Sequence, residues 1–140
     1  MHHLLSLEDL ELKKQFEAGL LPPSEFSHHR HIQLAYIYLC QYEQELAIIC
    51  MRQSLQSYLT FQGIDASKYH ETLTRAWILA VRHFMENAEP ALSAEEFIET
   101  HPVLLDKDIM LTHYSREHLF LEQAQTEFRE PDIQQIPRYV

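Results

Sequence analysis

Apolar side chains recur along this chain with the three-to-four-residue period of α-helices. The clearest pattern lies between residues 67 and 87, where a wide apolar arc predicts the most buried helix of the fold. Comparable apolar stripes predict three more helices, over residues 6–19, 24–41 and 43–61. The pattern therefore predicts four longer helices, and the short links between them favour antiparallel neighbours.

The rest of the chain is predicted to be less regular. A short helix opens at Ser93 and another covers about residues 115–127, with a loop or an irregular turn over residues 103–114. Residues 1–5 and 131–140 are expected to be extended, and no segment keeps the alternation of a strand. We therefore predict an all-α fold. It is a single domain, a compact bundle of four longer helices plus one or two short helices and an extended C-terminal tail.

Composition excludes several classes of function. Gly19 and Gly63 are the only glycines among 140 residues, so the chain cannot build a glycine-rich phosphate loop. Eleven Lys and Arg stand against 21 Asp and Glu, and the resulting charge of -10 argues against a nucleic-acid partner. No apolar run is long enough to span a membrane, and the N-terminus lacks the apolar core of a signal peptide. Two cysteines in helical apolar patterns predict free thiols, so we expect a cytoplasmic protein.

A first cluster of histidines opens the helix predicted after residue 24. His28 and His31 are three residues apart and share a face with Ile32, Ala35 and Leu39, which form the core stripe. Both rings are therefore predicted to point inward. The positive end of the helix dipole disfavours a protonated imidazole there, and the neutral ring is the form that binds metals.

A second cluster surrounds His70, which lies at nearly the same helical angle as Thr74 and Trp77 and is also predicted to point inward. We interpret His28, His31 and His70 as ligands of one divalent transition metal, zinc or iron. Glu71 is then a further ligand or a general base that deprotonates a metal-bound water.

The loop after residue 102 supplies additional candidates. We predict His113 as a fourth, catalytic member of the site. A substrate pocket is predicted from the side chains that flank the two clusters. They are Tyr69, Thr74, Asp106 and Tyr114.

Two functions follow from these residues. The first is a metal-dependent enzyme that hydrolyses or oxidises a small molecule. The second is a helical module that binds a small molecule or a partner without metal, in which the three histidines form a hydrogen-bonded polar patch closed by residues 103–114. A single buried histidine is more often a hydrogen-bonded core residue than a metal ligand, which supports the second. Three inward histidines near helix starts are a less common coincidence, and the first is therefore the function that we predict. A homodimer formed through an apolar helix face is a third interpretation.

Five motifs, spread over about residues 15–137, carry a family resemblance. They are Phe26-x-His28-x-x-His31-Ile32 with Ala35 and Leu39, Tyr69-His70-Glu71-Thr72-Leu73-Thr74, Leu104-Leu105-Asp106-Lys107, His113-Tyr114-Ser115 and Pro131-Asp132. Together they resemble a family of small bacterial all-helical proteins of uncharacterised activity. The resemblance implies a bacterial cytosolic protein and singles out His28, His31 and His70, but it implies no particular reaction.

Overall fold

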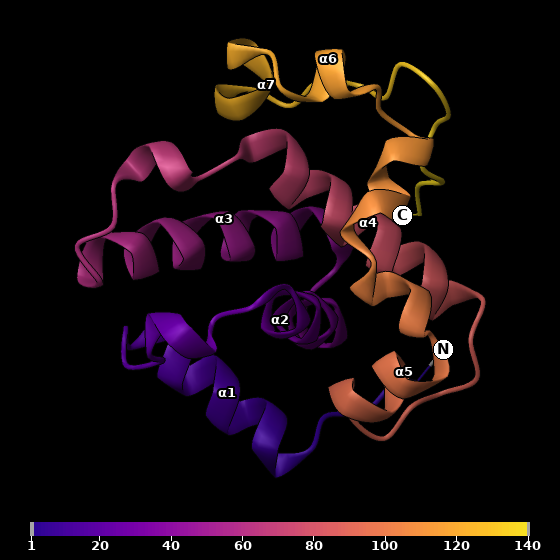
Figure 1. The fold of residues 1–140 in the computed structure, drawn as a ribbon. Coiled ribbons are helices and arrows are strands. Elements are labelled where there is room, and N and C mark those ends of the chain that lie inside the picture. The colour runs from indigo at the N-terminus through magenta and orange to yellow at the C-terminus, as the bar shows by residue number, and fades with distance from the viewer. Residues whose placement is uncertain (1, 140) are drawn as a thin grey trace.

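A computed structural model describes residues 2–139 and confirms the all-helical fold (Figure 1). The four predicted longer helices are present, and no strand occurs in residues 2–139. Their bounds are α1 Leu7–Glu17, α2 His28–Gln41, α3 Gln44–Phe61 and α4 Glu71–Glu86. In Figure 1, α2 is seen end-on in the centre of the bundle, and it contacts α1, α3, α4 and α5. The prediction of a helix bundle is therefore correct.

The central position of α2 follows from its sequence. Every residue from Ile32 to Leu39 is buried, including Gln33, so this helix has no solvent face along its middle. Its two tyrosines reach polar partners from inside the core. The hydroxyl of Tyr36 donates to the Leu4 carbonyl at 2.7 Å, and that of Tyr38 lies 2.7 Å from a Glu17 carboxylate oxygen. These bonds fix the N-terminal segment and α1 onto α2.

Caps and glycines set the helix ends. Ser6 and Asp9 form a reciprocal capping box at the start of α1, and Ser27 caps α2 by accepting from the Arg30 amide. Gly19 and Gly63 follow α1 and α3 with φ of 74° and 66°, the left-handed region that glycine adopts without strain. The two predicted helix stops are thus confirmed.

The C-terminal third is more broken than predicted. Two 3-10 helices lie within residues 102–112, where a loop or an irregular turn was predicted, and two short helices replace the one expected over residues 115–127. The break falls at Leu121, whose φ of -61° and ψ of 142° are extended. The elements are α5 Ala94–Thr100, η3 Pro102–Leu105, η4 Lys107–Thr112, α6 Arg116–Leu119 and α7 Glu122–Thr126.

Two further 3-10 turns, η1 Pro23–Glu25 and η2 Ala66–Lys68, precede α2 and α4. Figure 1 places α6 and α7 at the top of the view, beyond α3 and the start of α4. The tail after α7 forms no helix in the part of the chain that the structure describes. None of the helices between residues 2 and 139 has both the length and the apolar character that crossing a membrane requires.

Candidate functional site

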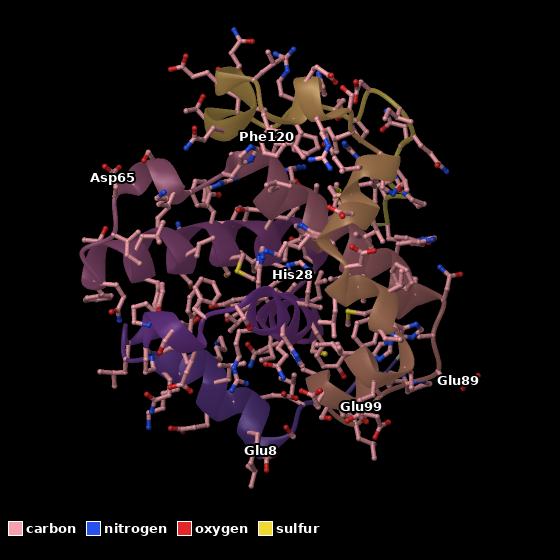
Figure 2. The ribbon with its side chains drawn as sticks, in the orientation of Figure 1. Glu8, His28, Asp65, Glu89, Glu99 and Phe120 are labelled. Atoms are coloured by element: carbon pink, nitrogen blue, oxygen red, sulfur yellow. The ribbon has the colours of Figure 1, made fainter. Side chains whose placement is uncertain are left out.

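His28 and His31 both lie at the start of α2, as predicted. Figure 2 shows His28 in the middle of the molecule, beside the near end of α2. Its Nε2 donates to the carbonyl oxygen of Leu104 at 2.9 Å, and its ring packs edge-on against Trp77 with 4.7 Å between centroids. The centroid of His31 is 6.3 Å from that of His28. His28 therefore ties η3 to the start of α2.

His31 carries a buried nitrogen without a partner. Its Nε2 makes no hydrogen bond with residues 2–139. Burial, with a smaller contribution from the charge of His28, lowers the pKa of His31 from 6.5 to about 4. Burial also lowers the pKa of His28, against the opposing effect of the Leu104 carbonyl. Both rings are therefore neutral at pH 7.

His70 lies outside the helix in which it was predicted. The predicted helix started near residue 67, but α4 begins at Glu71 because His70 is its N-cap. The His70 Nδ1 accepts from the Leu73 amide at 3.1 Å, which leaves the ring hydrogen on Nε2. Nε2 donates to the Leu119 carbonyl at 3.1 Å. The prediction that His70 belongs to the apolar arc of the helix is therefore wrong.

This geometry bears on the predicted metal centre. Both ring nitrogens of His70 form hydrogen bonds, and burial lowers its pKa. The neutral ring caps α4 and connects it to the carbonyl of Leu119. Between residues 2 and 139, no three side chains of His, Cys, Asp or Glu are grouped to hold a metal ion. As placed, His28, His31 and His70 do not fit one metal ion. A zinc or iron site remains a prediction from the sequence.

Replacing His70 tests its role as a cap. We expect His70→Ala to lower the free energy of unfolding by about 1–2 kcal/mol, since it removes both the cap and the bond to Leu119. His70→Asn should cost less, because asparagine is a good N-cap and loses only the second bond. Urea unfolding of both variants measures the difference. Equal losses would contradict the capping role.

Glu71 is the centre of a partly buried polar array. Its carboxylate accepts two bonds from the Arg52 guanidinium, from Nε at 2.9 Å and from Nη2 at 2.7 Å. The Tyr69 hydroxyl donates to the same carboxylate at 2.5 Å. Burial alone raises the pKa of Glu71, but the bonds from Arg52 and Tyr69 outweigh it and hold that pKa below its usual range. Glu71 is therefore ionised at neutral pH.

This array lines a cavity of about 720 Å³ between α3, η2, the start of α4 and α7, which we call the Arg52–Glu71 cleft. One wall is held by Gln125 of α7, whose side-chain amide donates to the carbonyls of Ser67 and Tyr69. The lining residues are Arg52, Gln56, Leu59, Thr60, Ala66, Ser67, Tyr69, Glu71, Glu122, Gln125, Thr126, Glu127 and Phe128. The volume is that of an ordinary small-molecule site.

Two of the predicted site residues, Glu71 and Tyr69, lie together in this cleft, and the others do not line it. The Thr74 hydroxyl donates to the His70 carbonyl at 2.7 Å, within the first turn of α4. Asp106 caps η4 by accepting from the Asp108 amide. Tyr114 is buried, and its hydroxyl donates to the Arg129 carbonyl at 2.6 Å.

His113 lies in a second cavity, away from Glu71. Its Nδ1 donates to the carbonyl of Gln134 at 2.7 Å, so it holds the C-terminal tail. The loop that contains it does lie against His28, through Leu104. That contact joins the loop to α2, as the metal-free alternative predicted, but His28 and His70 bond to separate carbonyls and His31 Nε2 has no partner among residues 2–139.

Arg52, Glu122 and Glu127 line the cleft but were not predicted as site residues from the sequence. Arg52 stands 19 residues before Glu71, beside the core residue Met51 on α3. One feature of the sequence could have identified Arg52. It is a basic residue at the edge of an apolar stripe, on a helix that was predicted to pack beside the helix of Glu71. No such feature marked Glu122 and Glu127, because the predicted continuous helix obscured the turn that places them.

The chain was compared with known protein families, curated proteins and solved structures. No family model matches it, and no curated protein or solved structure matches it either. The family resemblance of the histidine motifs therefore stays a prediction. Function is inferred below from the geometry of the Arg52–Glu71 cleft.

Proposed function

We propose that this protein is a small-molecule-binding helical module, and that its ligand carries a cationic amine and occupies the Arg52–Glu71 cleft. The observation that carries the proposal is the grouping of charges in one cavity of about 720 Å³. Three glutamates, Glu71, Glu122 and Glu127, line it against one arginine, Arg52. The class of function is that of the metal-free alternative from the sequence, but the ligand is placed in the Arg52–Glu71 cleft and not at the three histidines.

The carboxylates divide into two kinds. Glu71 is largely buried and already neutralises Arg52. Glu122 and Glu127 are exposed, and neither forms an ion pair within residues 2–139. Their charge favours a cationic ligand, and the net charge of -10 on the whole chain adds long-range attraction.

The floor of the cleft favours a ligand that also accepts hydrogen bonds. Arg52 uses Nε and Nη2 for Glu71, which leaves its third nitrogen, Nη1, outside that pair. Because the pair and the Tyr69 hydroxyl hold each other in place, this donor is preorganised for a ligand oxygen. Leu59 and Phe128 add apolar surface to the lining. An aliphatic amine with an oxygen acceptor matches all three features.

The electrostatics of Glu71 favour binding over acid–base catalysis. A general base works best when its pKa lies near the pH of the reaction. Arg52 and Tyr69 hold the pKa of Glu71 below its usual range and occupy its oxygens, so the carboxylate is a poor proton acceptor. Its role in the proposal is to fix Arg52 and to complete the negative wall.

Matched probes test the proposal. Titrating the ¹⁵N-labelled protein with 4-aminobutan-1-ol is expected to shift the amide signals of Thr60, Ser67 and Gln125 saturably. Butane-1,4-diol, in which a hydroxyl replaces the amine, should bind at least fivefold more weakly, because it lacks the charge. Equal binding of the two probes, or shifts that map elsewhere, would refute an amine site in this cleft.

A further inference from the structure

A second cavity, of about 460 Å³, is lined by other residues of α4 than the Arg52–Glu71 cleft. Its walls come from the C-terminal half of α4, from η3 and η4, and from the tail over residues 134–137. Most of its lining is apolar, with Phe84, Val103, Ile109 and Ile136 as the larger side chains. We call it the tail cavity, because the tail forms one wall.

The lining of the tail cavity contains no Asp, Glu, Lys or Arg among the residues that the structure describes. Charged residues make up 23% of the chain, and four of them line the Arg52–Glu71 cleft. The tail cavity therefore differs from that cleft in the charge of its lining. An ionic ligand would lose its hydration here without gaining a counter-charge. The cavity therefore selects uncharged molecules.

Two histidines supply polarity, and their hydrogen bonds favour opposite tautomers. His113 Nδ1 faces the Gln134 carbonyl at 2.7 Å and must donate, so the Nε2 of the neutral ring is an acceptor. His83 Nδ1 lies 2.8 Å from the Tyr139 hydroxyl, whose oxygen accepts from the Asn87 amide at 3.3 Å. The same Asn87 nitrogen lies 3.4 Å from His83 Nδ1, which favours Nδ1 as an acceptor. The tyrosine hydrogen is then directed at Nδ1, and the ring hydrogen of His83 is on Nε2, as a donor.

One acceptor and one donor in an apolar cavity are the complement of a hydroxyl group, which both donates and accepts. We propose that the tail cavity is a second binding site, for an uncharged, largely apolar molecule that carries a hydroxyl, such as a phenol. His113 accepts the ligand's hydroxyl hydrogen, and His83 donates to its oxygen. The apolar walls bury the ring.

The tail has a second role in this site. Besides the bond to Gln134, the carbonyl of His113 accepts from the Ile133 amide at 2.9 Å, and Ile136 is buried. In this proposal, His113 both holds the tail in place and accepts the hydrogen bond from the ligand. Ligand binding and docking of the tail are coupled through His113.

The test uses the full chain and two probes of similar size. 2-Naphthol is expected to shift the ¹³C-methyl signals of Val103, Ile109 and Ile136 saturably, and 2-methoxynaphthalene to bind five- to tenfold more weakly, because it lacks the hydroxyl hydrogen. 2-Naphthoate should bind at least tenfold more weakly than 2-naphthol. Equal affinity for the first two probes, or tight binding of the naphthoate, would overturn the proposal.

Two variants make the assignment specific. His113→Asn keeps a donor near the position of Nδ1 and removes Nε2, so the tail stays anchored while the preference for 2-naphthol disappears. Val103→Trp obstructs the cavity from a side chain that is 46% exposed, so it spares the core and should weaken both probes at least tenfold. An unchanged preference in His113→Asn, or unchanged affinities in Val103→Trp, would each refute the site.

Discussion

Replacing Glu71 by glutamine is expected to lower the free energy of unfolding by about 2–3 kcal/mol. The substitution leaves the Arg52 guanidinium without a counter-charge at a position where the Glu71 side chain is only 12% exposed. Breaking a buried ion pair from one side costs about 3–5 kcal/mol, and the 34% exposure of the Arg52 side chain reduces that figure. Urea unfolding at pH 7 measures the loss.

A double-mutant cycle separates this pair from a general loss of packing. The variant with both Glu71→Gln and Arg52→Met should be more stable than the sum of the single losses predicts, because no charge is left uncompensated. Glu130→Gln is the matched control, since it breaks the Arg138–Glu130 pair, whose side chains are 45% and 57% exposed, and should cost less than about 0.5 kcal/mol. Simple additivity in the cycle would contradict the account of Glu71.

Acid is expected to destabilise the fold through His31. His31 has a pKa near 6.5 in the unfolded chain, whereas burial lowers its pKa to about 4 in the folded protein. The folded state therefore holds fewer protons in this window, and its stability falls as the pH falls. Between pH 7.5 and 5 this group alone should remove about 2 kcal/mol. Burial lowers the pKa of His28 and His70 as well, so both act in the same direction.

Urea unfolding at several pH values measures this effect, and the NMR titration of the His31 ring identifies its source. The ring signal should titrate near pH 4, and His31→Phe should flatten the dependence of stability on pH by removing the titrating nitrogen. A midpoint near 6.5 for His31, or an unchanged pH dependence in the variant, would contradict this explanation.

The backbone of the fold is readable from the sequence because its signals are local. Helix stops at Gly19 and Gly63 follow from the freedom of glycine at positive φ, and the capping box of Ser6 lies within four residues. Apolar periodicity then assigns the four longer helices. The break at Leu121 has no comparable signal, because neither glycine nor proline marks it.

The candidate site could be predicted only in part from the sequence, because its residues come from different helices. Tyr69 and Glu71 were predicted as site residues, but their partner Arg52 comes from another helix, and such pairing is decided by tertiary packing. His70 was misplaced because a histidine cap resembles, in sequence, an inward histidine one turn into a helix. Its position depends on the separate 3-10 turn η2, which the periodicity of apolar residues does not reveal.

The central claim is that the acidic wall of the Arg52–Glu71 cleft binds an amine. Its most direct test is the affinity for 4-aminobutan-1-ol of two doubly substituted variants with the same net charge. Glu122→Gln with Glu127→Gln should weaken binding about five- to tenfold. Glu89→Gln with Glu99→Gln, at exposed sites that Figure 2 shows on the opposite side of the molecule from α7, should leave it within twofold. Equal losses in the two variants would show that the amine responds to overall charge, and would contradict a site in the cleft.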